Sequence, residues 1–378
     1  RRVMIRRRLI GPVAFGMAVS LSVGAPVTSL AGTPEFGRSA EEWARLRDNV
    51  LEYEELEDLV YEYNTTVLNN AQTYNRENAR DRREVVKEYM DQAADALDAY
   101  TYTSSPDLLV AANRAEQAAE NNVLEGDRTA SMIGYKQTEK GIAKQAQTAM
   151  NTYYKLQYQL TALEKNRELL AATVGSVQGR QSQGMATYAE VLNAQQNVQS
   201  ADAQIIAMKS QIEDTRQNLI IMLGWKQGDM PEIRPMPAVQ MDRISAMNVE
   251  EDTRTALGAD YTLQLDQRKM NNSITDANKN IYKKTVEEDK QKIAVAVNDG
   301  YQKVIQAKSS YDEAVLNLEV ETKNWNAANT KYQLGSISRM EYLQAEAGLV
   351  QAQMDREVKN LDLFQAMENY DWIIKGVR

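Results

Sequence analysis

Apolar side chains recur every seven residues between residues 187 and 223. One row consists of Val191, Val198, Ile205, Ile212 and Leu219. A companion row lies three residues further on and consists of Ala194, Ala201, Met208, Thr215 and Met222. This a/d pattern, held for about five heptads, predicts a left-handed coiled-coil helix on the order of 55 Å long at 1.5 Å per residue. The rows themselves are expected to be core rather than a ligand site.

A looser version of this seam follows residue 338, with apolar residues three or four positions apart at Leu343, Ala347, Val350, Met354, Val358, Leu361 and Phe364. Four more helical patterns are expected over about 65–101, 128–182, 249–283 and 286–333. Capping boxes that begin at Ser39 and Thr285 are interpreted as helix starts, and Ser105 followed by Pro106 as another. No alternating apolar and polar run about ten residues long lies between these helices, so we expect an all-α fold of long antiparallel coiled-coil helical hairpins.

A local pattern in residues 180–194 is repeated in residues 331–345, 151 positions later. In both copies a glycine precedes a hydroxyl residue and then a glutamate: Gly184, Thr187 and Glu190, and again Gly335, Ser338 and Glu341. Glycine supplies the left-handed backbone that ends one helix. The hydroxyl caps the next helix, and the glutamate three residues later completes a capping box. Each copy predicts a tight turn between two long helices, so the chain is internally duplicated.

Prolines divide the chain into two halves. The stretches 107–230 and 238–378 contain none, whereas three prolines cluster between them. We therefore expect four segments, which are a signal peptide (1–31), a first helical-hairpin repeat (32–223), a Pro/Gly linker (224–245) and a second helical-hairpin repeat (246–378).

The first 31 residues have the pattern of a targeting segment. Five arginines lie within the first eight residues, an apolar stretch runs from Leu9 to about Val23, and Ser29-Leu30-Ala31 is a small-x-small cleavage signal before Gly32. An apolar stretch of about 15 residues is short for a membrane span, which favours a cleaved signal peptide over a retained anchor. We expect an exported protein.

The chain has no cysteine and no histidine. This excludes disulfides, thiolate and Ser-His-Asp catalysis, and the usual zinc ligands, and we predict no catalytic residue, cofactor or metal.

Removing residues 1–31 leaves 39 basic and 53 acidic residues, a net charge of −14. An exported acidic chain is not expected to bind nucleic acid. A mean hydropathy of −0.56 fits narrow apolar seams rather than a thick core.

The duplicated turn, with helices that end near Gly224 and Gly376, resembles the TolC family of outer-membrane efflux proteins. The family's tip motif runs from an aromatic residue through glycine to a hydroxyl, an acid, Leu and Ala. Tyr332-Gln-Leu-Gly335 fits its start, whereas the first copy has Gln181 in place of the aromatic. Family members usually insert strands between ascending and descending helices, and we expect a variant without them.

The resemblance implies a homotrimer whose twelve long helices form a hollow TolC-like α-barrel. Its tips would meet a periplasmic adaptor (membrane fusion) protein, which in turn sits on an inner-membrane ABC or RND pump. In such a trimer Glu190 and Glu341 would form rings of like charge that narrow the pore, and Tyr332 would bond across to Glu190 in the closed state. The adaptor contact would involve the remaining tip residues Gly184, Thr187, Gly335 and Ser338. Alternatively, the glutamates only cap helices and the tyrosine only packs.

We interpret the chain as a passive conduit for small molecules or proteins in efflux or type I secretion, not as an enzyme. The resemblance places it in the outer membrane, with the cell wall of a single-membrane bacterium as the other location considered. A structural coiled-coil scaffold or spacer of the envelope is the alternative. Carboxylate-based glycan hydrolysis ranks third, since it needs two carboxylates flanking a cleft and rods have few clefts.

Overall fold

A computed structural model describes residues 32–76 and 80–378. Its helices, in chain order, are α1 (Ala40–Leu46), α2 (Leu56–Tyr63), α3 (Thr65–Arg76), α4 (Arg82–Thr103), α5 (Pro106–Asn121), α6 (Arg128–Ser182), α7 (Tyr188–Met222), α8 (Met241–Ala246), α9 (Val249–Ala259), α10 (Tyr261–Asn272), α11 (Asp276–Gln333) and α12 (Arg339–Ile374). Short 3-10 helices span Glu35–Gly37 and Tyr53–Glu55, and two strands are β1 (Val50–Leu51) and β2 (Glu232–Ile233). The predicted signal peptide, residues 1–31, lies outside the described residues. Within the described ranges, no helix combines the length and apolar character that a membrane crossing requires.

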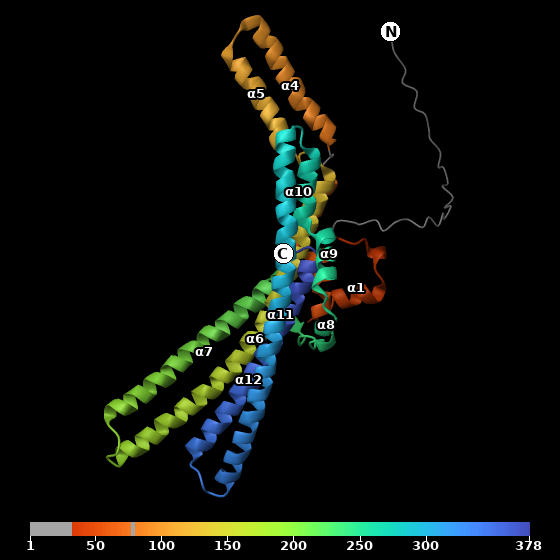
Figure 1. Cartoon of the computed structure of the whole chain (residues 1–378). Coiled ribbons are helices and arrows are strands. Elements are labelled where there is room, and N and C mark those ends of the chain that lie inside the picture. The colour runs from red at the N-terminus through yellow and green to blue at the C-terminus, as the bar shows by residue number, and fades with distance from the viewer. Residues whose placement is uncertain (1–31, 77–79) are drawn as a thin grey trace, which may run out of the picture.

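Two long antiparallel hairpins dominate the molecule (Figure 1). Helix α6 has 55 residues and returns through α7 with 35, and α11 has 58 and returns through α12 with 36. Both turns lie at the same end of the molecule, and the hairpins diverge towards them. Helix α7 packs on α6, α6 on α12 and α12 on α11, so the four helices form one layer with α7 and α11 at its edges. The duplicated helical hairpins predicted from the sequence are confirmed.

The ascending helix of each half is interrupted at a capping residue. Between α2 and α3, the side chain of Asn64 accepts a hydrogen bond from the backbone N–H of Thr66 at 3.0 Å. Between α9 and α10, the side chain of Asp260 accepts one from the backbone N–H of Leu263 at 2.8 Å. Asn64 and Asp260 therefore interrupt their halves in the same way.

Each descending helix ends in a glycine that packs against one of these interruptions. Gly224 follows α7 with a φ of +97°, and Gly376 follows α12 with a φ of +91°. A Cβ atom on Gly224 would lie 2.5 Å from the Cβ of Tyr63. On Gly376 it would lie 2.1 Å from the backbone oxygen of Ala259. Glycine is required at both places, for the backbone angle and for the space.

A shared apolar core joins the two halves in the middle of the molecule. It combines α1 and α2 with parts of α6, α7 and α12. The indole Nε1 of Trp372 donates to the Gln147 side chain at 2.7 Å, and the rings of Tyr53 and Phe364 meet edge to face with centroids 5.0 Å apart. Helix α12 is therefore held by a polar contact with α6 and by an aromatic contact with the 3-10 helix before α2.

The strands β1 and β2 pair in parallel, with Leu51 opposite Ile233. They connect the segment before α2 to the segment after α7. The sequence predicted no strand, because a two-residue strand is too short to produce an alternating pattern. The predicted linker, 224–245, thus contains β2 and most of α8.

A third, shorter hairpin is present only in the first half. It consists of α4 and α5 and projects at the end opposite the two turns (Figure 1). Pro106 opens α5 directly after Ser105, as predicted. In the second half, only the three residues 273–275 separate α10 from α11.

Several predicted helix bounds are wrong. The helix expected over 65–101 is divided into α3 and α4, and that over 249–283 into α9 and α10 with the start of α11. Thr285, expected to start a helix, lies inside α11, where its hydroxyl donates to the carbonyl of Ile281. The cap of α11 is Thr275, ten residues earlier. A Thr-x-x-Glu spacing also occurs inside helices, so it identifies a start only where the preceding backbone leaves the helix. The capping box at Ser39 is present as predicted.

Replacing Gly376 with alanine should destabilise the fold strongly. The new Cβ would overlap the Ala259 carbonyl in addition to straining the backbone. Gly228→Ala is the matched control, because Gly228 has a φ of +89° with no atom within 4 Å of an added Cβ. We expect backbone strain of about 1–3 kcal/mol in both variants and a further loss of about 1–3 kcal/mol in Gly376→Ala. Urea unfolding midpoints measure the difference, and equal losses would contradict the close packing.

Candidate functional site: the two helical tips

The two turns between long helices have the same backbone structure. After α6, Gly184 has a φ of +73°, and the Met185 N–H donates to the Arg180 carbonyl at 2.8 Å. After α11, Gly335 has a φ of +70°, and the Ser336 N–H donates to the Lys331 carbonyl at 2.8 Å. This is the Schellman pattern of a helix end. We call residues 180–194 the first tip and residues 331–345 the second tip.

Both predicted capping boxes are present. In the first tip the Thr187 N–H donates to Oε2 of Glu190 at 2.6 Å, and the Glu190 N–H donates to the Thr187 hydroxyl at 3.2 Å. In the second tip the Ser338 N–H donates to Oε2 of Glu341 at 2.8 Å, and the Glu341 N–H donates to the Ser338 hydroxyl at 3.2 Å. The start of each descending helix is therefore fixed by its own side chains.

The tip glutamates remain ionised at neutral pH. Hydrogen bonds from Thr187 lower the pKa of the Glu190 carboxyl, and hydrogen bonds from Ser338 lower that of Glu341. A guanidinium nitrogen of Arg180 lies 3.6 Å from the other carboxylate oxygen of Glu190. Both side chains lie at the surface, so each tip presents a fixed negative charge to solvent.

Tyr332 lies within its own tip. Its ring stacks on that of Tyr342, with centroids 4.8 Å apart and an angle of 25° between the planes. The Glu190 carboxylate is engaged by Thr187 in the other tip. Within one chain the two tips stand apart (Figure 1), so the bond from Tyr332 to Glu190 stays a prediction for the assembled state.

Exposed apolar side chains surround the tip glycines, and the sequence analysis did not single them out. They are Met185, Tyr188 and Leu192 in the first tip and Leu334 in the second. Leu334 is 76% exposed directly before Gly335. A Cβ atom added to either Gly184 or Gly335 would meet nothing within 4 Å, so the backbone is open as well. Apolar groups gathered around an open turn are typical of a surface that another protein covers.

The two edge helices also carry exposed apolar side chains. They include Ile206 and Ile221 on α7 and Val295, Leu316 and Val320 on α11. The heptad rows did not reveal them, because those rows identify the face of α7 that packs on α6. Exposed apolar groups along both edges of a layer are typical of surfaces that another protein chain covers.

A polar hollow lies between α6, α11 and α12, with a volume of about 680 Å³. Its charged lining residues are Lys144, Lys155, Asp299, Lys303, Asp362 and Arg378. Burial lowers the pKa of Lys144, whose ammonium donates to the Val377 carbonyl at 3.4 Å. Across residues 32–76 and 80–378, no group of three or more carboxylates is placed to hold a metal ion.

No protein-family model matches the chain. Over 103 residues it is 36% identical to the multidrug resistance outer membrane protein MdtP of Escherichia coli K12, a stretch that covers 26% of this chain and 21% of that protein. MdtP of Shigella flexneri matches with the same identity and coverage. The chain thus spans about a fifth of the length of the curated relatives that it matches.

Solved outer-membrane channels share the fold. The CmeC outer membrane channel of Campylobacter jejuni superposes with a TM-score of 0.53 at 12% identity, over 94% of this chain and 93% of that one. The outer membrane protein VceC of Vibrio cholerae gives a TM-score of 0.50 at 12% identity, over 90% and 99% of the two chains. These neighbours are TolC-family channels, so the resemblance read from the tip motif is confirmed for the fold, which is TolC-like and helical.

Thr187→Ala should loosen the first tip without unfolding the chain. The substitution removes the acceptor for the Glu190 N–H, and a lost N-cap costs about 1 kcal/mol, or roughly fivefold in local opening. Hydrogen exchange of the amides in the first turn of α7 measures this opening. Thr161→Ala is the control, since the Thr161 hydroxyl only donates to the Gln157 carbonyl inside α6. Equal exchange in both variants would show that the capping box does not hold the tip.

Proposed function

We propose that this chain is a subunit of a passive conduit, a closed ring of copies that carries small molecules or proteins across the cell envelope. The observation that carries the proposal is the pair of unlike edges on the four-helix layer, α7 on one side and α11 on the other, each with exposed apolar residues. The fold shared with outer-membrane channels and the sequence similarity to a multidrug resistance protein support the same reading.

Two unlike edges favour head-to-tail assembly of several copies over a solid rod. When the α7 edge of one copy meets the α11 edge of the next, the contact is head-to-tail, and the curvature of the layer decides whether the ring closes. By resemblance to the TolC family, we propose a ring of three copies with twelve long helices in all. Helix α6, with 55 residues, is on the order of 80 Å long, so the enclosed passage is a long tube.

We assign the tips to the contact with an adaptor. Their glycines leave the backbone open and their apolar side chains lie uncovered, which suits a partner that packs helix against turn. By resemblance this partner is a periplasmic adaptor (membrane fusion) protein, which connects the conduit to an inner-membrane ABC or RND pump. The outer membrane is the proposed location.

We also assign Glu190 and Glu341 to the entrance of the passage. In a ring each position recurs in every copy, so fixed carboxylates are brought together, where they repel anions and attract cations. Their caps hold them ionised and immobile, which is the state that a selective entrance needs.

A coiled-coil scaffold of the envelope is the competing function. A scaffold needs seams between helices but no open edge on either side of the layer. The exposed apolar residues on α7 and α11 therefore favour the conduit.

Ile206→Asp should prevent ring formation. Ile206 is 70% exposed on the α7 edge, and a carboxylate there would be buried without a partner when the ring closes. Met230→Asp is the matched control, since Met230 is equally exposed at 70% but lies outside the layer, between α7 and β2. Light scattering after size exclusion reports the mass of residues 32–378. A ring from wild type and the control, and a single chain from Ile206→Asp, is the expected result; a wild-type single chain would favour the scaffold.

Glu341→Ala combined with Tyr332→Phe should raise the leak of small solutes through the assembled conduit. The pair removes the carboxylate that accepts from the Ser338 N–H in the second tip and the hydroxyl predicted to hold the closed state. Conductance in planar bilayers is the measurement. Glu319→Ala, which breaks an exposed ion pair with Lys323 higher on α11, is the control. Unchanged conductance in the double variant would remove the gate assignment.

A further inference from the structure

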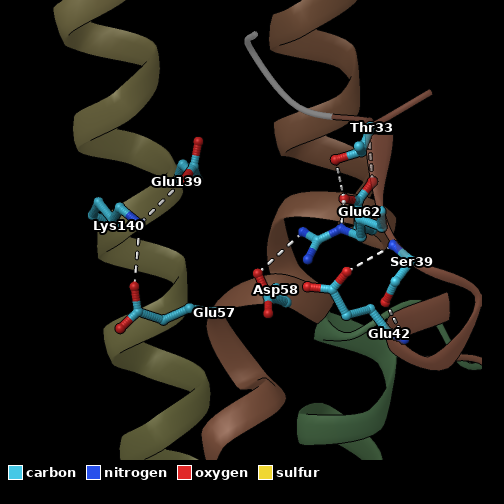
Figure 2. Close-up of polar contacts among 9 residues, drawn as sticks. Thr33, Ser39, Glu42, Glu57, Asp58, Glu62, Glu139 and Lys140 are labelled. Atoms are coloured by element: carbon cyan, nitrogen blue, oxygen red, sulfur yellow. Dashed lines mark hydrogen bonds and ion pairs between the residues drawn. The ribbon is translucent and has the colours of Figure 1, made fainter. Parts of the chain in front are cut away.

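A buried carboxylate holds the first described residues of the chain. Glu62 on α2 is only 6% exposed, and it accepts hydrogen bonds from the Thr33 N–H at 2.7 Å and from Nε of Arg38 at 2.8 Å. The Thr33 hydroxyl donates to the same carboxylate. Figure 2 shows Thr33 and Glu62 facing each other at the centre of this cluster. A single glutamate thus holds both Thr33 and Arg38, and the Trp43 indole holds the same segment by donating to the Glu35 carbonyl at 2.7 Å.

The same segment follows directly after the cleavage signal read from the sequence. Ala31 ends the small-x-small signal, and Gly32 would be the first residue of the processed chain. From the lengths of the three backbone bonds between them, the nitrogens of Gly32 and Thr33 are at most about 4 Å apart. An amine on Gly32 therefore lies within about 7 Å of the Glu62 carboxylate, and an added Cβ on Gly32 would touch Leu68 of α3 at 3.6 Å.

Glu62 shares its cation with a second carboxylate. Arg38 also donates to Asp58 at 3.1 Å, so one guanidinium serves two carboxylates. Burial disfavours the charged guanidinium, but the hydrogen bonds to Glu62 and Asp58 outweigh it and raise the pKa of Arg38. Glu42 adds a third carboxylate nearby, where it caps Ser39 (Figure 2). Of the other charged groups in view, Lys140 pairs with both Glu57 and Glu139.

We propose that Glu62 is the binding site for the amino terminus created when the leader is removed. A leader peptidase of the exporting cell hydrolyses the Ala31–Gly32 peptide bond with one water. Ala31 departs as a carboxylate, and the Gly32 amine takes up a proton. The resulting ammonium pairs with Glu62 and gives this carboxylate a cation that it does not share with Asp58. The proposal rests on the export signal and on this cluster, and it holds whether or not the chain forms a conduit.

Binding of the new terminus links processing to folding. The unprocessed chain has a neutral peptide nitrogen at Gly32, so Glu62 gains the ammonium only after cleavage. The ammonium then adds to the hydrogen bonds from Thr33 and Arg38 that hold the segment before α1 against Glu62 of α2. The processed chain is therefore the more stable form.

The test compares two chains, one that begins at Gly32 and one that retains Ser29–Ala31, each as wild type and as Glu62→Gln. Both are released from an amino-terminal fusion by a protease that leaves no extra residue. We expect the chain that begins at Gly32 to melt about 1–3 °C higher, and this difference to vanish in Glu62→Gln. Asp58→Asn is the matched control and should retain the difference, because Asp58 binds Arg38 but not Thr33. Equal melting of the two wild-type chains, or the same difference in Glu62→Gln, would overturn the proposal.

The pH dependence provides a second readout that needs no variant. The ordinary pKa of an α-amine is about 7.7–8.0, and pairing with Glu62 raises it in the folded state. The extra stability is therefore complete below about pH 7.7 and is lost as the pH rises through the folded pKa. NMR titration of the amine in ¹⁵N-glycine-labelled protein reports that pKa directly. A value above 8 is expected, and an ordinary value would overturn the assignment.

Discussion

The structure depends on a close backbone approach that is made twice, where the end of a descending helix meets the break in an ascending one. At Gly376 the distance leaves no room for a side chain, and the Tyr261 N–H donates to the Gly376 carbonyl at 3.3 Å across the same contact. At Gly224 the corresponding link is the Asn64 side-chain amide, which donates to the Met222 carbonyl at 2.8 Å. These contacts fix where each long hairpin starts and the direction in which it leaves the core, and so they position the tips many turns away.

The tips combine a locally fixed backbone with an uncovered apolar surface. Their backbone is fixed by local hydrogen bonds, a Schellman turn followed by a capping box, whereas no part of residues 32–76 and 80–378 covers their outer surface. A rigid turn with uncovered apolar groups loses little conformational entropy when a partner binds. The capping glutamates therefore have two compatible roles, since the hydrogen bonds that stabilise the helix start also keep the carboxylates charged.

The features that depend on neighbouring residues in the sequence could be predicted from it. Those that depend on contacts between distant segments could not. The tip turns, the capping boxes and the α7 seam follow from residues within one or two helical turns, so they were correct. The start of α11 was misplaced, because Thr285-x-x-Glu288 satisfies the same spacing inside a helix as Thr275 does outside one. Pairing of β1 with β2 joins residues about 180 positions apart and leaves no periodic trace. The exposed apolar residues of the tips and edges were not recognised either, because whether an apolar residue is buried depends on the tertiary packing of other segments against it.

The α4–α5 hairpin belongs to the first half alone, whereas the long hairpins belong to both. In a ring of three copies, first-half and second-half hairpins alternate around the axis, so the tip end would have approximate sixfold symmetry. The opposite end, marked by one α4–α5 hairpin per copy, would have only threefold symmetry (Figure 1). A partner that recognises a feature common to both tips could therefore bind with twice the stoichiometry of one that recognises the α4–α5 hairpin. Because the α4–α5 hairpin is inserted in one half only, the two ends of the same ring would bind different numbers of partner molecules.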